Sequence, residues 1–454
     1  MKLHGDQEFY PKLWALVLPI ALQQFILNLV SASDALMLGF LGQDELSAVS
    51  LAGQVQFVFS LFLSAITIGS NIFIAQYYGK KDLPMVEKFF GNAMMLSIPV
   101  SLLFTLCTAL FPSGVMRIFT SENVLIEKGA EYLRTVSLSY LLCGITQVIV
   151  CIMKNCSMAK KSTYITLVCA VLDMGMNAVL ILGLFGIPGI GIIGAAISTV
   201  AARLLELVWA VIAFRKADVV HLKRQYLFHP SKGIQAAFWK RTAPVLGNEL
   251  VWGMGFTMGS VIMGHLGGDA TAAHAVAGIV KNLLVCFCLG LGCGGGILIG
   301  NELGAGRLER AKAYGGTLCR LSILAGALTG ALLLLLSPVI LHFSKLTEQA
   351  EHDLVGMLLI CSYYMIGKSV NSTVIAGIFC AGGDSGFGFL CDTVVMWGII
   401  VPLGLLAAFV WQLPVPTVYF ILWLDEMLKL PAVYRHYKKY QWVKDLTEKE
   451  GSNL

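Results

Sequence analysis

Apolar segments of membrane-spanning length recur along the whole chain and are separated by short polar connections. A helix of about 20 residues crosses the hydrocarbon core of a bilayer. Helices are predicted because backbone polar groups in lipid must be satisfied within each segment, and because these runs lack the alternation of barrel strands. If each crossing takes about 20 residues, the chain has about twelve spans. They are expected at residues 13–38, 48–75, 89–111, 131–153, 162–185, 190–214, 237–262, 272–300, 318–342, 354–380, 387–410 and 417–434.

The two halves of the chain repeat one another. When the sequence is shifted by 225 positions, the segment from Pro19 to Gly91 aligns with a later segment without a gap, and the matched pairs include Pro19 with Pro244, Gly39 with Gly264, Asp44 with Asp269, and Gly79 with Gly304. Matching Gly and Pro positions reflect a shared backbone geometry rather than a shared apolar composition. Six spans per half give both copies the same orientation. We therefore predict an all-α integral membrane protein with two six-helix lobes, related by a pseudo-twofold axis along the membrane normal.

The expected organisation has four parts, which are an N-terminal lobe (1–214), a cytoplasmic linker (215–236), a C-terminal lobe (237–434) and a cytoplasmic tail (435–454). Lys and Arg gather in alternate connections, so both termini are predicted to be cytoplasmic. The first apolar run is too long for a signal peptide and is expected to be retained.

Composition excludes several classes of function. Hydrophobic residues make up 57% of the chain and charged residues 13%, about half the charged fraction of an average globular protein. The net charge of +5 comes from basic residues scattered among loops, so no nucleic-acid partner is expected. The 12 cysteines include no C-x-x-C pair, which argues against disulfides or a cysteine metal site. The absence of H-E-x-x-H and G-x-S-x-G motifs argues against an enzyme, and no cofactor is expected.

Asp34, Asp173 and Glu249 are acidic residues that lie within long apolar segments of the predicted spans. A charge in the hydrocarbon region costs at least about 2.5–3.5 kcal/mol, so such residues usually face a cavity and have a function. The repeat places Gly259 opposite Asp34 and Gln24 opposite Glu249. The scaffold is therefore duplicated whereas the intramembrane acids Asp34 and Glu249 are not, which predicts different duties for the two halves.

Three segments together resemble the multidrug and toxic compound extrusion (MATE) family: SASDALMLGFLGQDELSAVS (31–50), LDMGMNAVLILGLFGIPGIGIIGAAISTV (172–200) and AGGDSGF (381–387). This resemblance, with the length and the twelve spans, covers nearly the whole chain. It implies a cation-coupled antiporter of the cell (inner or plasma) membrane that exports amphipathic, often cationic, organic compounds. It further implies small-molecule substrates, a lipid bilayer as environment, and a monomer.

The resemblance also implies a cation site formed by Asp34, Asp173, Asn177 and Thr199. The chain departs from the family pattern because better-known members often have Asn where Asp173 stands. Asp173 and Asn177 are four residues apart and share a helix face. Carboxylate, amide and hydroxyl oxygens suit a hard cation such as Na⁺, and two neighbouring carboxylates can instead share a proton. The sequence leaves both coupling ions open.

The C-terminal lobe contains a second candidate site for protons or substrate, with Glu249, Lys281 and Asp392 as its members. Intramembrane charges tend to pair, so Glu249 with a lysine such as Lys281 or Lys368 could alternatively be a structural ion pair.

Local charge spacing predicts two further pairs. Arg203 and Glu206 are three residues apart on one helix, and Lys429 follows Asp425 and Glu426 at helical spacing. Both groups are predicted to form structural ion pairs.

An alternative function is a flippase for a lipid-linked saccharide precursor, made by the same broader superfamily. Such a protein needs a strongly cationic cavity for phosphate groups. The acids inside the predicted spans argue against it.

Overall fold

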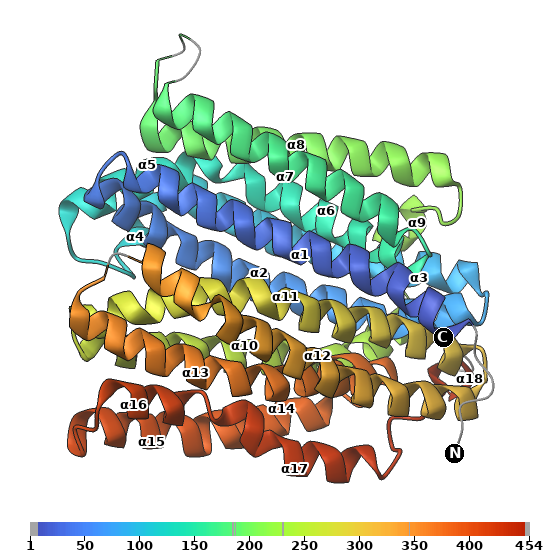
Figure 1. Ribbon diagram of the computed structural model, residues 1–454. Helices are drawn as coiled ribbons and strands as arrows, with labels where there is room; N and C mark the ends of the chain where they lie inside the picture. Colours follow the sequence, from blue (N-terminus) through green and yellow to red (C-terminus); the bar gives the residue numbers. More distant parts are fainter. Residues whose placement is uncertain (1–7, 184–185, 187, 229–230, 345, 450–454) are drawn as a thin grey trace. The chain divides into compact units, whose positions relative to one another are not determined.

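The computed structural model describes residues 8–183, 186, 188–228, 231–344 and 346–449, and all regular secondary structure within them is helical (Figure 1). Ten helical segments among these residues are long and apolar enough to cross a membrane. The prediction of an all-α membrane protein is therefore confirmed.

The helices of the N-terminal half are α1 (Phe9–Gly39), α2 (Gln43–Gly79), α3 (Leu83–Leu110), α4 (Pro112–Met116), α5 (Asn123–Val136), α6 (Leu138–Asn155), α7 (Ala159–Leu182), α8 (Gly191–Ala217) and α9 (Arg224–Phe228). Those of the C-terminal half are α10 (Lys232–His265), α11 (Gly268–Gly304), α12 (Leu308–Phe343), α13 (Glu348–Asn371), η1 (Ser372–Phe379), α14 (Gly386–Asp392), η2 (Thr393–Ile400), α15 (Val401–Leu405), η3 (Leu406–Val410), α16 (Val415–Leu422), α17 (Asp425–Tyr437) and α18 (Leu446–Lys449). The η elements are π-helical stretches that continue the neighbouring α-helices.

Two predicted spans differ in character from the ten apolar helices. The span at 237–262 lies within α10, a helix whose mean hydropathy is lowered by polar residues such as Asn248 and Glu249. The span at 417–434 is interrupted, because α16 ends at Leu422 and α17 begins at Asp425. Charged residues in the first turn of α17 make this second helix polar.

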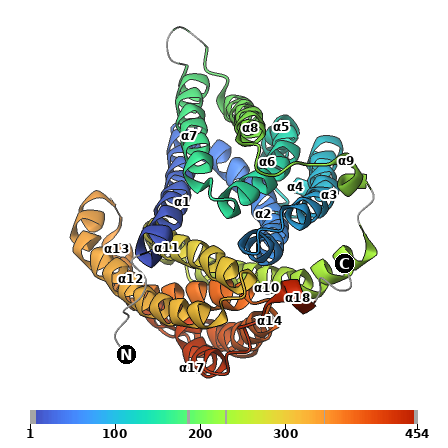
Figure 2. The same ribbon diagram turned by 90° about the vertical axis from the view of Figure 1, so that its right-hand side faces the viewer.

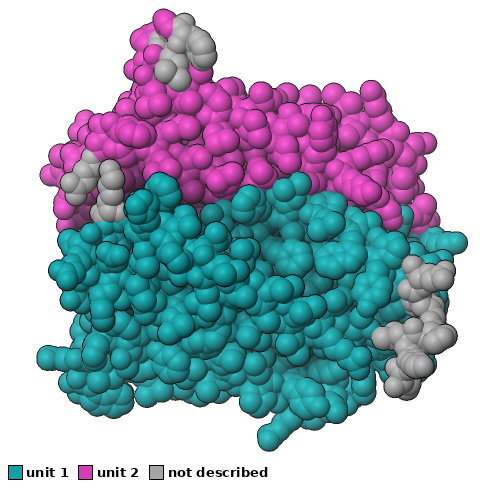
Figure 3. All heavy atoms as spheres, in the orientation of Figure 1, with its two compact units in different colours: residues 1–25, 75–82, 237–454 teal, residues 26–74, 83–236 magenta. Residues whose placement is uncertain are grey.

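The described chain divides into two compact units, which Figure 3 shows in different colours. Unit 1 comprises Met1–Phe25, Ala75–Asp82 and Ala237–Leu454, and unit 2 comprises Ile26–Ile74 and Leu83–Ala236. Helices α1 and α2 therefore each contribute to both units. The last turns of α2 belong to unit 1, although most of that helix belongs to unit 2.

The core of unit 2 forms where large apolar side chains of several helices meet. Phe59 of α2, Leu133 of α5 and Tyr140 of α6 are buried together. The rings of Phe59 and Tyr140 make an edge-to-face contact with centroids 5.1 Å apart. Helices α7 and α8 pack along each other beside this core, and they carry most of the polar groups described below.

Unit 1 is held together by close helix contacts at glycine. Helix α12 packs along α13, as Figures 1 and 2 show, and α11 packs on α13 and η1. A Cβ on Gly292 of α11 would lie 2.6 Å from the carbonyl oxygen of Ser372 at the start of η1. Small residues allow such close backbone approach between membrane helices. The π-helical stretch η1 thus begins where two backbones touch.

Candidate functional site

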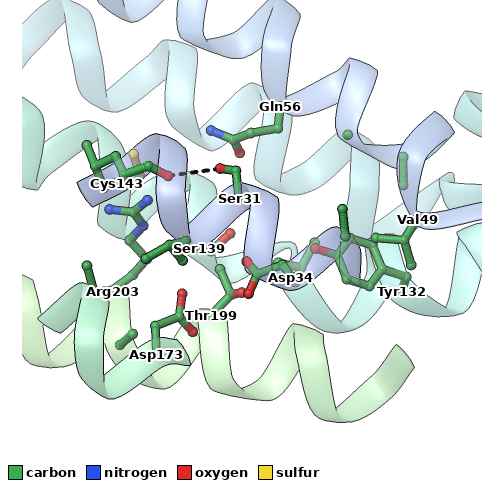
Figure 4. Close-up of a pocket in the computed structure, with 18 of the residues that line it drawn as sticks. Ser31, Asp34, Val49, Gln56, Tyr132, Ser139, Cys143, Asp173, Thr199 and Arg203 are labelled. Carbon is green, nitrogen blue, oxygen red and sulfur yellow. Dashed lines mark hydrogen bonds between the residues drawn. The ribbon is translucent and has the colours of Figure 1, made fainter. Parts of the chain in front are cut away.

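A cavity of about 530 Å³ opens within unit 2, and the predicted site residues Asp34 and Asp173 both line it. Asp34 comes from α1, Asp173 from α7 and Thr199 from α8, and all three side chains line the cavity (Figure 4). The surrounding wall is largely apolar and includes Leu27, Val30, Leu38, Val49, Ala52, Val136 and Ala170. The structure thus brings together side chains that lie up to 165 positions apart in the sequence.

The carboxylate of Asp34 is the end of a short hydrogen-bond chain. The Nδ2 group of Asn177 donates to Oδ1 of Asp34 over 2.8 Å. The hydroxyl of Ser198 in turn donates to Oδ1 of Asn177. Both Asn177 and Ser198 are buried. The amide of Asn177 therefore presents its NH₂ group, rather than its oxygen, to Asp34.

Close packing of the end of α7 against the start of α8 creates this chain. Gly183 ends α7 in the left-handed conformation, with φ 74° and ψ 54°, which glycine adopts without strain. The amide of Ile190 then donates to the carbonyl of Leu180 over 2.9 Å. A Cβ on Gly194 would lie 2.7 Å from that same carbonyl oxygen. This close approach of the two helices places Asn177 against Ser198.

Asp173 and Thr199 offer oxygen atoms to the cavity with few competing contacts. Oδ1 of Asp173 is buried and has no hydrogen-bond partner among the described residues. The hydroxyl of Thr199 donates to the carbonyl of Ala195 over 2.9 Å, which leaves its lone pairs available. With Asp34, these groups form an oxygen-rich wall suited to a hard cation.

The predicted pair of Arg203 and Glu206 is confirmed. Their side chains contact at 2.8 Å on α8. Thr166 of α7 donates to the other carboxylate oxygen of Glu206 over 2.9 Å. All three line the same cavity. The pair places a guanidinium and its carboxylate partner side by side in the cavity wall, so it adds no net charge there.

The three candidate residues of the C-terminal half do not form one cluster of contacts. Asp392 pairs with Lys429 at 2.9 Å. Within the described residues, neither Glu249 nor Lys281 has an ion-pair partner inside 4.0 Å. Lys368 contacts Glu426 at 3.0 Å instead of Glu249. The structural ion pair considered for Glu249 is therefore absent from the described part of the chain.

Lys429 is the centre of a buried charge cluster. In addition to Asp392, it contacts Asp425 at 3.0 Å and Glu426 at 3.4 Å, as its spacing on the helix predicted. All four side chains are buried. Asn371 donates to Glu426 over 2.7 Å. The contact between Lys429 and Asp392 joins α17 to the end of α14, a long-range link that helical spacing does not reveal.

Lys281 lies among aromatic rings. Its Nζ is 3.3 Å from the ring centroid of Trp423, and the centroids of Tyr364 and Phe256 lie at 5.4 Å and 5.5 Å. The side chain is buried, with 4% of its surface exposed. Cation–π contacts replace an ion pair at this lysine.

Among the described residues, no three side chains of His, Cys, Asp or Glu come together in a group that could hold a metal ion. The oxygen wall at Asp34 contains two carboxylates and neutral oxygens, so it is a different kind of candidate.

Comparison with known proteins identifies the family. The MatE family model matches two segments, residues 19–179 and 244–406. The chain belongs to the MATE family. The second matched segment begins at 244 and the first at 19, an offset of 225 that equals the shift of the internal repeat. Members of this family are membrane transporters of small molecules and not enzymes.

Two Bacillus subtilis (strain 168) proteins are among the similar curated proteins. The uncharacterized transporter YisQ is 22% identical over 451 residues, covering 98% of this chain and 97% of its own. The probable multidrug resistance protein YoeA is 25% identical over 376 residues, covering 80% of this chain and 79% of its own.

Solved structures show the same fold. A crystal structure of MATE in complex with MaL6 superposes with a TM-score of 0.86 at 17% identity, covering 97% of both chains. The outward-facing conformation of a multidrug resistance MATE family transporter of the MOP superfamily has a TM-score of 0.86 at 15% identity, covering 95% of both chains. This MATE protein is therefore a multi-pass membrane protein with the architecture of its family.

Proposed function

We propose that this MATE protein is a cation-coupled antiporter that exports amphipathic, often cationic, organic compounds by alternating access. The observation that carries the proposal is the cavity of unit 2, where Asp34 and Asp173 share an apolar-walled space with the oxygen of Thr199. Two acids in such a wall favour a positive charge, and the wall itself favours an apolar body.

Coupling requires the ion and the substrate to favour different conformations, because a ligand shifts an equilibrium only through its differential affinity for the two states. A proton would neutralise one of the carboxylates. A sodium ion would use the oxygens of Asp34, Asp173 and Thr199, and the amide of Asn177 would join them by rotating its oxygen toward Asp34. Either ion would remove the negative charge that attracts an organic cation.

The proposed setting is the cell membrane, with both termini in the cytoplasm and a single chain as the working unit. The Lys and Arg bias of the connecting loops supports this orientation. Substrate would then leave the cytosol while the coupling ion enters it.

The decisive experiment measures export of a fluorescent organic cation from proteoliposomes under a sodium gradient and, separately, a pH gradient. Wild type is compared with Asp34→Asn and with Glu309→Gln, which changes an exposed acid at the start of α12. We expect one gradient to drive export by wild type and Glu309→Gln, with at least a tenfold loss in Asp34→Asn. The effective gradient identifies the ion.

If wild type moves the cation under neither gradient, the antiport proposal is wrong for this class of substrate. Translocation of a fluorescent lipid-linked saccharide would then be measured in the same vesicles.

A further inference from the structure

The segment that follows α17 is packed into unit 1 rather than loosely attached. Trp442 is fully buried, and its ring stacks on Tyr437 with centroids 5.6 Å apart. Leu446 and Thr447 are also buried. A Cβ on Gly382 would clash with the backbone carbonyl of Trp442. Only glycine at this position allows the segment to pack so closely on the turn after η1.

One side chain on α2 joins this segment to the rest of unit 1. Gln76 is fully buried, and its Nε2 donates to the carbonyl of Ala381 over 2.7 Å and to that of Lys444 over 3.2 Å. Its Oε1 accepts from the amide of Leu446 over 2.8 Å. The amide of Gln76 therefore connects three parts of the chain that are separated by about 65 to 370 positions.

Neighbouring contacts surround this junction. Arg241 in the third turn of α10 donates to the carbonyl of Gly383 over 2.9 Å, and Ser385 donates to the carbonyl of Arg241 over 2.6 Å. Lys80 reaches the carbonyl of Thr447 at 3.4 Å. The turn at 381–385, the end of α2 and the C-terminal segment thus form one polar junction in unit 1.

The internal repeat shows that the junction is an addition to the helix scaffold. Asn301 on α11 is the repeat equivalent of Gln76, and the two helices contact each other through glycine on both sides. Oδ1 of Asn301 is buried without a hydrogen-bond partner in the described chain. Both helices therefore contribute a glycine to the contact, whereas among the described residues it is Gln76 that holds a hydrogen-bonded segment and Oδ1 of Asn301 that lacks a partner.

The position of the junction on α2 gives it a mechanical consequence. Helix α2 passes from unit 2 to unit 1 between Ile74 and Ala75, one residue before Gln76. A change in the relation between the units must therefore bend α2 near this point or release Gln76 from its partners.

We propose that residues 442–447 form an intramolecular clamp that holds the end of α2 in unit 1 and releases Gln76 during each transport cycle. The release step rests on the proposed antiport function, whereas docking of the clamp does not. Three hydrogen bonds and a buried tryptophan hold the clamp closed, so its opening is an activated step.

Hydrogen exchange tests docking of the clamp without any substrate. We expect the amide of Leu446 to exchange at least tenfold more slowly in wild type than in Gln76→Leu, which removes its acceptor. The matched control is Gln235→Leu, because in the described chain the side-chain amide of Gln235 makes a single weak contact, with the sulfur of Met95. Equal exchange rates at Leu446 in wild type and Gln76→Leu would overturn the clamp whether or not any compound is transported.

A reversible cross-link tests release. The pair Gln76→Cys and Leu446→Cys is introduced together with Cys293→Ser, because Cys293 is the exposed native cysteine in the described chain. We expect oxidation to lower gradient-driven transport at least tenfold and reduction to restore it, with no such effect in either single variant. Transport at the same rate in the oxidised and reduced forms would show that release is not required.

Discussion

Gly79 and Gly304 occupy equivalent positions in the two repeats, and each lies against the backbone of the other's helix. A Cβ on Gly79 would clash with the carbonyl of Asn301, and a Cβ on Gly304 would clash with the carbonyl of Gln76. Since Gln76 and Asn301 are themselves repeat equivalents, the contact between α2 and α11 is locally symmetric. Ala75 of α2 also packs against Gly300 of α11, which is its own equivalent in the second repeat.

Alanine at either glycine should therefore destabilise the protein. Gly79→Ala and Gly304→Ala each insert a methyl group against a rigid carbonyl, and overpacking of this kind costs about 1–3 kcal/mol. We expect a lower melting temperature in detergent for both variants. Transport should fall as well, because the end of α2 can no longer approach α11.

The repeat supplies matched controls for this prediction. Gly53 and Gly278 are also equivalent residues of α2 and α11, and a Cβ at either would meet no atom within 4 Å. Alanine there should be neutral or stabilising by about 0.5–1 kcal/mol, because glycine is unfavourable inside a helix. Equal destabilisation by all four variants would contradict the proposed close contact.

The glycine contact also illustrates how much of this protein follows from its sequence. The spans can be predicted from the recurring apolar segments. The repeat can be predicted from matching glycine and proline positions, which depend on backbone geometry. The break in the last span lies just before Asp425 and Glu426, and acidic residues are favoured in the first turn of a helix.

Only some residues of the candidate site could be predicted from the sequence. Acids such as Asp34 stand out because a charge in an apolar segment is unusual. Ser198 did not stand out, since a hydroxyl in a helix is ordinary and its contact with Asn177 depends on the approach of α7 to α8. For the same reason, the link between Asp392 and Lys429 could not be read from local spacing.

Ser198 should tune the affinity of the coupling ion without carrying it. Its hydroxyl holds the oxygen of Asn177 away from Asp34, and a hydrogen bond of this kind contributes about 0.5–1.5 kcal/mol. Ser198→Ala should therefore shift the ion concentration for half-maximal transport by about threefold to tenfold, with little change in the maximal rate. Initial rates over a range of ion concentrations measure both quantities.

Thr199→Ala is the informative companion to Ser198→Ala. Thr199 lines the cavity, and its hydroxyl contacts only its own helix among the described hydrogen bonds. Its removal should weaken coupling to sodium but leave coupling to protons intact, because a shared proton needs only the carboxylates. Loss of proton-driven transport in Thr199→Ala would contradict this division of roles.

Lys429 should be essential for folding rather than for transport alone. Its replacement by Met leaves the buried carboxylates of Asp392 and Asp425 without their shared partner, and breaking a buried pair costs about 3–5 kcal/mol. We expect Lys429→Met to yield little folded protein. Adding Asp392→Asn should recover part of the loss, and thermal melts of the single and double variants measure this coupling.

Lys281 should behave differently from Lys429 although both are buried. Within the described chain it contacts no carboxylate inside 4.0 Å, and its main partner is the ring of Trp423. Lys281→Met leaves no acid without an ion-pair partner. It removes a cation–π contact of about 2 kcal/mol, and burial of the apolar methionine side chain offsets this loss. The melting temperature should therefore change far less than in Lys429→Met. A collapse in the yield of folded Lys281→Met would show that this ammonium compensates an acid in unit 1, with Glu249 as the first to test by adding Glu249→Gln.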